Sequence, residues 1–210
     1  LHTWSLAVEE QFYLIFPILF LVHHYLCRKT GTRLQKITGT LLFPTLLLIS
    51  LLICSTESIH AQNRAYFLLP SRFWELATGV ILCQFHTSGF FRVQSKLKAN
   101  AILVSGLFLI SIAAVFADES RFPFPWALAP VSGCLLCIIA ISFNNNPTIL
   151  DNKVLVFTGR ISYSLYLWHW PIIVMMRWTT GIQTSLQLLI ASVLTAAFGF
   201  FSWYRIETPL

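Results

Sequence analysis

Charged side chains are scarce in this sequence of 210 residues, because Asp, Glu, Lys and Arg together make up only 10% of it. An ordinary globular domain carries roughly 25% charged residues. Hydrophobic residues make up 56%, and the mean hydropathy is +0.71. A soluble domain of this length cannot bury so many apolar side chains, so the composition argues against an ordinary soluble protein and favours lipid as the solvent.

Several short motifs are also missing. The sequence has no Walker phosphate loop, no GxGxxG fingerprint, no GxSxG nucleophile turn and no HExxH zinc motif. Its five cysteines lie in or beside apolar segments, and an odd number there argues against a disulfide framework. Cys134 and Cys137 form a CxxC pair, but no second pair or histidine lies nearby, so we predict no metal site. No basic region precedes the first apolar stretch, so we expect no signal peptide.

Long apolar blocks fill most of the chain. A transmembrane helix needs about 20 mainly apolar residues. The blocks predict an all-α integral membrane protein, a polytopic bundle of about seven transmembrane helices. The predicted spans are 7–26, 39–55, 71–85, 101–117, 126–143, 161–178 and 184–204. We expect a single unit over 1–210, with no separate soluble domain.

The net charge of +6 does not predict nucleic-acid binding, because the positive residues are concentrated in two short loops. By the positive-inside rule these loops are cytoplasmic. Leu1 is then expected outside and Leu210 in the cytoplasm. The basic residues of the first loop are Arg28, Lys29, Arg33 and Lys36, and those of the second are Arg92, Lys96 and Lys98.

Polar residues inside apolar spans are costly, and a functional role is the first interpretation. Ser5, Glu9 and Tyr13 follow one another at steps of four residues, so a helix places them on one face. Glu9 is therefore a candidate site residue. Glu10 lies off this face, and we interpret it as an acidic residue that complements the dipole at the helix N-terminus.

A second polar stripe contains Arg72, Glu75 and Gly79, at spacings of three and four residues. One interpretation is an intrahelical ion pair that makes both charges tolerable in the membrane. The other is a site in which Arg72 holds an anionic group such as a phosphate. We expect Glu9, Arg72 and Glu75 to gather near the external face.

A third stripe contains Ser162, Tyr166 and His169. His169 lies nine residues after Arg160, at a depth of about 13–14 Å along a helix, near the middle of the bilayer. One interpretation is a direct role in a functional site. The other is a hydrogen bond between helices that only fixes packing. We read Glu207 as the partner of Arg205 in a terminal ion pair.

These polar stripes lie in stretches that resemble a known family. HTWSLAVEEQFYLIFP (2–17) closely resembles the WSLxxExxFY signature of the acyltransferase-3 family, the bacterial membrane O-acyltransferases. YFLLPSRFWELATGV (66–80) resembles that family's next conserved stretch. GRISYSLYLWHWPIIV (159–174) and YRIETPL (204–210) resemble its last two spans. The resemblance therefore covers the whole chain, as the C-terminal portion of a longer acyltransferase domain.

The resemblance implies that an acyl group, usually acetyl from acetyl-CoA or another acyl-CoA, passes to a hydroxyl of a cell-surface glycan such as lipopolysaccharide O-antigen. It implies a bacterial inner membrane, no bound cofactor, and in longer relatives a periplasmic SGNH hydrolase-like domain. We predict Glu9 and His169 as catalytic residues. The residues predicted to bind substrate or support the site are Trp4, Ser5, Tyr13, Arg72, Glu75, Ser162 and Tyr166.

One departure from the family bears on activity. The family's catalytic histidine lies in its first span, followed by an arginine motif, and neither region matches this sequence. Acyl transfer to a hydroxyl needs a general base. Two other functions therefore stay open, a polytopic transporter and a catalytically inactive remnant. A transporter would show inverted repeats or paired broken helices, and we find neither in the sequence.

Overall fold

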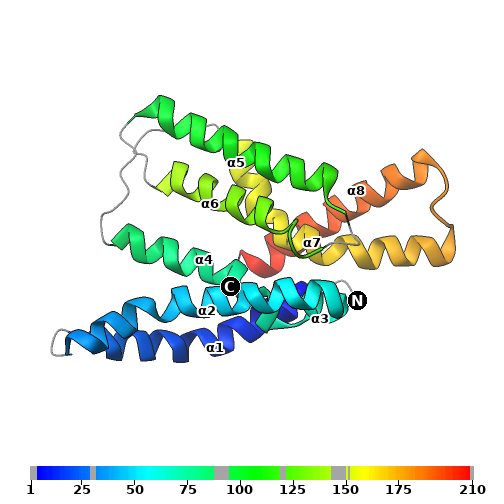
Figure 1. Cartoon of the computed structure of the whole chain (residues 1–210). Coiled ribbons are helices and arrows are strands. Elements are labelled where there is room, and N and C mark those ends of the chain that lie inside the picture. Colours follow the sequence, from blue (N-terminus) through cyan, green and yellow to red (C-terminus); the bar gives the residue numbers. More distant parts are fainter. Residues whose placement is uncertain are drawn as a thin grey trace. The chain divides into compact units, whose positions relative to one another are not determined.

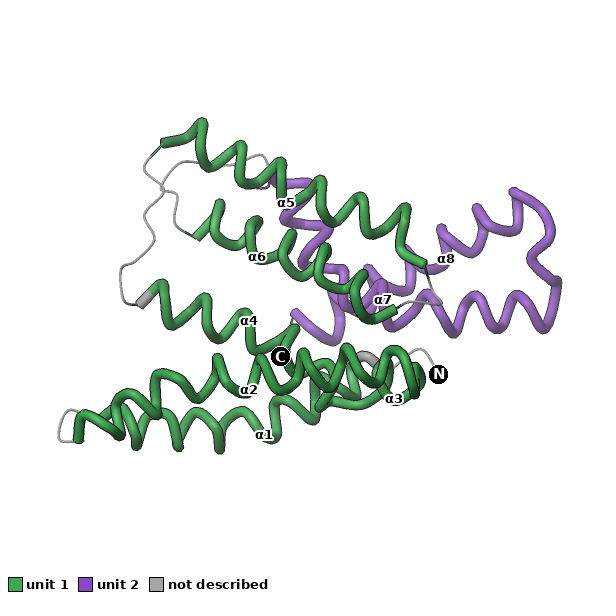
Figure 2. Tube along the Cα trace, viewed as in Figure 1, with its two compact units in different colours: residues 1–146 green, residues 147–210 purple. Residues whose placement is uncertain are grey.

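The computed structural model describes residues 4–28, 32–87, 95–118, 122–142, 150 and 152–208, and of residues 4, 5 and 87 it describes the backbone. Over these residues the chain is helical and contains no strand. The chain divides into two compact units, Leu1–Asn146 and Pro147–Leu210 (Figure 2). The predicted all-α class is confirmed, and each unit is described by itself.

Unit 1 contains six of the described helices (Figure 1). Helix α2 packs along α1 and along α4, and α5 packs along α6. The short helix α3 is separated from α4 by Leu68, which has extended backbone angles. The bounds are α1 Trp4–Leu26, α2 Arg33–His60, α3 Gln62–Phe67, α4 Leu69–Thr87, α5 Lys96–Phe116 and α6 Leu128–Ser142.

Several helices differ in length from the predicted spans. Helix α2 begins at Arg33 instead of residue 39, because Thr32 and Gln35 form a capping box that satisfies amide groups of the first turn. Helix α6 begins at Leu128 instead of residue 126, after turns over 122–127. Pro123 and Pro125 fall in these turns and have no amide hydrogen for a helical ladder.

Four of the described helical segments are long and apolar enough to cross a membrane: Leu6–Leu26, Arg33–His60, Lys96–Phe116 and Ser185–Glu207. Leu128–Ser142 is a shorter apolar helix. Helices α4 and α7 do not meet this measure, since their spans include the polar stripes of Arg72 and of His169. The chain has the helices of a membrane protein, and the count of seven spans stays a prediction.

Two glycines set the spacing between α5 and α6. A Cβ atom at Gly106 would lie 2.7 Å from the Gly133 carbonyl oxygen, and a Cβ atom at Gly133 would lie 2.7 Å from the Gly106 carbonyl oxygen. Such a distance is far inside van der Waals contact, so only glycine lets the two backbones approach this closely. Small residues at helix crossings are typical of membrane bundles, where packing drives association.

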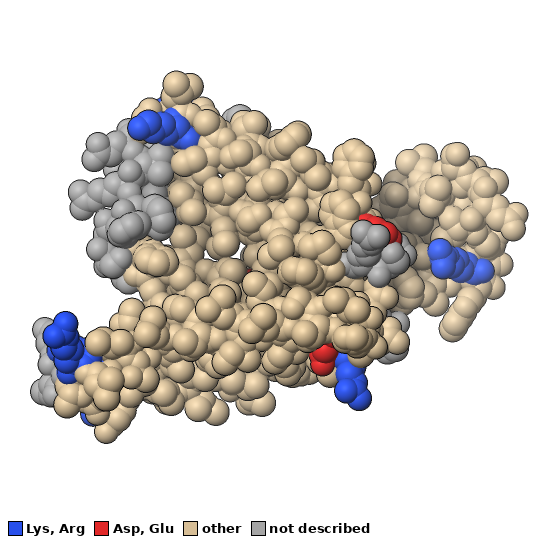
Figure 3. Space-filling view, in the orientation of Figure 1, with Lys and Arg blue, Asp and Glu red and all other residues tan. Residues whose placement is uncertain are grey.

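Most of the surface visible in Figure 3 is uncharged, and its blue Lys and Arg atoms gather in a few places. Within unit 1, the C-terminal ends of α1 and α4 and the N-terminal ends of α2 and α5 lie at the same end (Figure 1). Arg28, Arg33 and Lys36 are exposed beside the first connection, and Lys96 and Lys98 beside the second. The fold therefore places these five basic residues at one end of unit 1.

Unit 2 is a helical hairpin. Helix α7 Lys153–Thr179 packs along α8 Ser185–Ser202, and α8 continues into the π-helix η3 Trp203–Glu207. A turn with Gly181 at a φ of 72° reverses the chain, and a Thr184–Gln187 capping box begins α8. A Cβ atom at Gly199 would lie 2.8 Å from the Leu165 side chain, so the two helices are close at this level.

Candidate functional site

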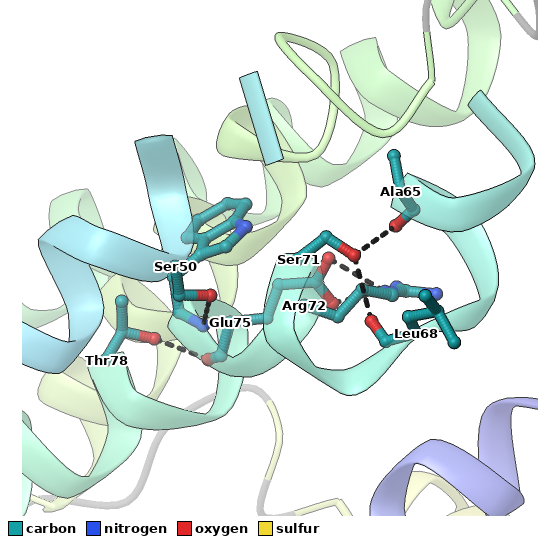
Figure 4. A network of polar contacts seen from close by, with 8 residues as sticks. Ser50, Ala65, Leu68, Ser71, Arg72, Glu75 and Thr78 are labelled. Carbon is teal, nitrogen blue, oxygen red and sulfur yellow. Dashed lines mark hydrogen bonds and ion pairs between the residues drawn. The ribbon is translucent and has the colours of Figure 1, made fainter. Parts of the chain in front are cut away.

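The first turn of α4 carries the predicted pair Arg72 and Glu75, and buried hydroxyls fix this turn. Ser71 is fully buried. Its hydroxyl lies within hydrogen-bond distance of the carbonyls of Leu68 at 2.9 Å, Ala65 at 3.1 Å and Arg64 at 3.2 Å (Figure 4). The hydroxyl has one proton, which these carbonyls at the break between α3 and α4 share, and the contact holds the angle at which α4 starts.

Ser50 of α2 ties the same turn to the neighbouring helix. Its hydroxyl donates to the Pro70 carbonyl oxygen at 2.6 Å and accepts from the Trp74 amide nitrogen at 2.9 Å. In a regular helix these two backbone groups bond each other directly. Ser50 is buried, so its hydroxyl is inserted into the ladder of α4 and fixes the register of α2 against α4. A single serine within the apolar run LLISLL was its only signal in the sequence.

Arg72 and Glu75 form a bidentate ion pair across this turn. Arg72 Nε donates to Glu75 Oε1 at 3.0 Å, and Nη2 donates to Oε2 at 2.8 Å. The two side chains are only 16% and 17% exposed. The guanidinium also lies 5.8 Å from the centre of the Tyr66 ring. Two parallel hydrogen bonds hold the planar guanidinium in one orientation against the carboxylate. The pair is therefore a rigid polar feature at the start of α4.

The ion pair lies on the wall of a cavity of about 380 Å³, named here the α4–α6 cavity. Helix α4 contributes Arg72, Glu75, Thr78 and Gly79 to the wall. The turn segment and α6 contribute mainly apolar residues: Phe122, Ala127, Pro130, Val131, Cys134, Leu135 and Ile138. A largely apolar pocket with a few converging polar groups is typical of a binding site for a small molecule.

The turn segment that closes this cavity is anchored to the ends of α2 and α3. Ser58 accepts a hydrogen bond from the Phe124 amide at 3.3 Å, and Gln62 Nε2 donates to the Phe122 carbonyl at 3.1 Å. Trp74 is buried with Cys54 and Ala127, and Phe122 and Phe124 pack against them. These anchors leave no local signal in the sequence, because each joins residues far apart in the chain.

Glu9 lies on α1 and is half-buried, whereas Glu10 and Tyr13 are exposed. The neighbouring face of α1, with Val8 and Phe12, packs in one apolar cluster with Leu69 and Phe73 of α4. The structure brings Arg72 and Glu75 together, but no hydrogen bond or ion pair joins Glu9 to another described residue. The clustering of Glu9 with this pair stays a prediction.

The structure describes the backbone of Trp4 and Ser5, in the first turn of α1, and their side-chain roles lie outside what it describes. Leu1 and Leu210 also lie outside the described residues. Of the basic loop residues, Lys29 and Arg92 also lie outside the described residues. The predictions that rest on these side chains therefore stay predictions.

In unit 2, His169 is half-buried on α7. Its Nδ1 atom lies 2.6 Å from the Tyr166 carbonyl oxygen, and the two rings are 5.5 Å apart. A carbonyl oxygen only accepts hydrogen bonds, so this contact needs a proton on Nδ1. Ser162, the third member of the predicted stripe, is exposed and donates to the Gly159 carbonyl of its own helix at 2.7 Å.

The buried polar contact of unit 2 involves a different serine. Ser164 is fully buried and its hydroxyl donates to Glu207 Oε1 in the π-helix. Among the described residues Glu207 forms no ion pair with Arg205, which is exposed. The prediction of a terminal Arg205–Glu207 pair is therefore wrong. The π-helix adds a residue to the last turn, which turns Glu207 toward α7, and π-helical turns are frequent at functional sites.

These features lie in stretches that match a known family. The sequence model of the acyltransferase-3 family, described as an acyltransferase domain, matches residues 1–204. The match covers α1 to α8 and includes both the Arg72–Glu75 pair and His169. The chain belongs to the acyltransferase-3 family. No solved structure matches it.

Curated relatives match over the whole chain. O-acetyltransferase OatA of Staphylococcus aureus strain NCTC 8325 is 31% identical over 221 residues, which cover 100% of this chain and 36% of that protein. The SACOL0978 protein of strain COL is 33% identical over 226 residues, which cover 99% of this chain and 35% of that protein. The chain therefore spans about a third of the length of these relatives.

Proposed function

We propose that the protein containing this chain is a membrane O-acyltransferase that moves an acyl group, acetyl from acetyl-CoA, to a hydroxyl of a cell-surface glycan such as lipopolysaccharide O-antigen. The observation that carries the proposal is the Arg72–Glu75 pair on the wall of the α4–α6 cavity, within a stretch that matches the family. The similarity to a protein named O-acetyltransferase OatA supports acetyl as the group transferred.

The chemistry of the transfer defines what the residues have to do. The acceptor hydroxyl oxygen attacks the thioester carbonyl carbon, a C–O bond forms and the C–S bond breaks. The hydroxyl proton passes to a base and from there to the leaving thiolate, so that no net charge accumulates. Glu9 and His169 are the proposed carboxylate and imidazole of this proton transfer.

Arg72 and Glu75 are proposed to position the acceptor. A sugar hydroxyl near the pair can donate to a carboxylate oxygen of Glu75, and an anionic group can accept from Arg72. Trp4, Ser5, Tyr13, Ser162 and Tyr166 keep the supporting roles that the sequence predicts. We place the protein in the bacterial inner membrane, with the acyl donor in the cytoplasm and the glycan outside.

The test uses the full-length protein in membrane vesicles with radiolabelled acetyl-CoA and purified acceptor glycans, O-antigen among them. We expect label in ester linkage on one acceptor, and about a 10²–10⁴-fold slower transfer for Glu9→Gln if Glu9 acts in proton transfer. Glu10→Gln is the matched control, because Glu10 is the exposed neighbour. Unmodified acceptor that crosses the membrane would favour a transporter, and an absence of both activities would favour a remnant.

A further inference from the structure

Gly79 of α4 lies in the walls of two cavities. The first is the α4–α6 cavity of about 380 Å³. The second, of about 480 Å³, lies among α1, α2 and α4, and is named here the α1–α4 cavity. Its wall includes His23 of α1 and Cys83 and Gln84 of α4. Both cavities belong to unit 1, and Gly79 is the one described residue that their walls share.

No packing contact of the described residues requires glycine at this position. A Cβ atom at Gly79 would meet nothing within 4 Å. At four other glycines of these helices, Gly39, Gly106, Gly133 and Gly199, an added Cβ atom would lie between 2.6 and 2.8 Å from an atom of another segment. Glycine inside a helix costs about 0.5–1 kcal/mol relative to alanine. Gly79 instead leaves open space beside a position that lines both cavities.

The polar side chains that α4 contributes to the two walls lie at different levels, Arg72 and Glu75 near its start, Thr78 at its middle and Gln84 near its end. Arg72, Glu75 and Thr78 face the α4–α6 cavity, and Gln84 faces the α1–α4 cavity. From Arg72 to Gln84 the helix rises about 18 Å. The hydrocarbon core of a bilayer is about 30 Å thick, so the stretch of α4 that lines the two cavities is more than half as long as this core is thick. Apolar side chains form most of the wall between the polar ends.

We propose that the two cavities are halves of one route for the acyl group, and that Gly79 sets the size of the largest acyl group transferred. The proposal rests on the acyl transfer proposed above, in which donor and acceptor lie on opposite sides of the membrane. The acyl group moves while still bonded to its donor, so no bond forms or breaks on the way. An apolar wall with polar ends suits an acyl chain that carries a polar thioester.

The first arm of the test changes the size of the side chain at position 79. In the full-length protein, Gly79→Ala, Gly79→Val and Gly79→Leu are compared with the same changes at Gly159. Gly159 is the matched control, since its added Cβ atom also meets nothing within 4 Å and it lines neither cavity. Acetyl-CoA and longer acyl-CoA donors are assayed, with protein amount and thermal unfolding measured for every variant.

We expect transfer to fall as the side chain at position 79 grows, and to fall more for longer acyl groups. Each added methylene in a fitted apolar pocket is worth about a 10–200-fold change in rate. The Gly159 variants keep the parent rate with every donor. Parent rates in Gly79→Leu with all donors would overturn the proposal, and so would an equal loss in Gly159→Leu.

The second arm does not depend on activity. Cys83 lines the α1–α4 cavity and Cys134 lines the α4–α6 cavity, and both thiols are exposed. In a full-length protein that keeps only these two cysteines, a bismaleimide with a flexible spacer should join them past Gly79. We expect Gly79→Leu to abolish this cross-link, as read by mass spectrometry of digested peptides, and Gly159→Leu to preserve it. Labelling by a monofunctional maleimide should stay the same.

The two arms separate failure of this proposal from failure of the proposed function. If the parent protein transfers no acyl group, the proposed function fails, and the cross-link still reports whether the cavities join. A cross-link that persists in Gly79→Leu overturns the proposed connection of the two cavities at Gly79. So does a cross-link that never forms although both thiols react. A cross-link blocked by Gly79→Leu together with unchanged transfer overturns the acyl route and leaves the acyltransferase intact.

Discussion

At the scale of single residues, variants of the Arg72–Glu75 pair can separate its contribution to stability from its role in acyl transfer. Both side chains are mostly buried, and two hydrogen bonds join them. Breaking such a pair leaves one uncompensated buried charge, which costs about 3–5 kcal/mol. We expect Glu75→Gln to lower the thermal unfolding temperature of the full-length protein and to abolish transfer.

The double variant Arg72→Gln/Glu75→Gln removes both charges and should recover most of the lost stability, because no charge is left unpaired. We expect transfer to stay low, since neither an anion-binding guanidinium nor a carboxylate remains at the cavity wall. Thermal unfolding and acetyl transfer are measured on the same preparations. Recovery of transfer in the double variant would show that the pair acts only in folding.

His169 gives the second prediction at this scale. Glutamine keeps a side-chain hydrogen-bond donor near the Tyr166 carbonyl but lacks the basic Nε2 atom. The bond to Tyr166 lies within α7 itself, and even a hydrogen bond between membrane helices is worth only about 0.6 kcal/mol and rarely more than 1.7 kcal/mol. We therefore expect His169→Gln to accumulate at the normal protein level and to lose most of its transfer activity.

The matched control for His169 is His60→Gln, because His60 is exposed at the end of α2 and lines neither described cavity. Protein level and transfer rate are measured for both variants in the full-length protein. A His169→Gln protein that transfers acyl groups at the parent rate would assign this histidine to packing. The site role predicted from the Ser162, Tyr166 and His169 stripe would then have no support.

At the scale of helices, the close approach of α5 and α6 depends on glycine at both contact positions. A Cβ atom at Gly133 would lie 2.7 Å from a backbone oxygen and 2.8 Å from the Ile110 side chain. Because a backbone cannot move aside as a side chain does, Gly133→Leu forces the helices apart. Overpacking of this kind costs about 1–3 kcal/mol or more. We expect a lower unfolding temperature for Gly133→Leu and little change for Gly159→Leu.

Measurement of thermal unfolding for both variants in detergent checks this expectation. Equal unfolding temperatures would show that α5 and α6 do not approach at these glycines. The same pairing keeps α6 in place as one wall of the α4–α6 cavity. A loss of transfer in Gly133→Leu that exceeds its loss of folded protein would therefore link helix spacing to the site.

At the scale of the whole molecule, the charges predict its orientation in the membrane. The helix ends that border the two basic loops lie at the same end of unit 1 (Figure 1), and basic loops are retained in the cytoplasm. Reporter fusions to the full-length protein at Gly31, Ser95 and Gly181 test this orientation. We expect cytoplasmic signals at Gly31 and Ser95 and a periplasmic signal at Gly181, and a periplasmic signal at either of the first two would reverse it.

The class of protein and its family follow from the amino-acid sequence alone. Scarce charge and long apolar blocks require helices in lipid, because only a helix satisfies every backbone group within its own segment. The stripe of Arg72 and Glu75 also follows from sequence, since residues three apart share a helix face. The residues around this stripe, 66–80, are themselves part of the resemblance to the acyltransferase-3 family.

Which polar groups meet depends on the tertiary fold. Ser50 lies in α2 and bridges two backbone groups of α4, and Ser164 rather than Ser162 reaches Glu207. Helical spacing places each of these residues on a face, but it does not say which neighbour that face will meet. The place of Gly79 in the walls of two cavities also depends on the tertiary fold. The helices packed around a cavity define it, and the sequence near Gly79 does not show which helices these are.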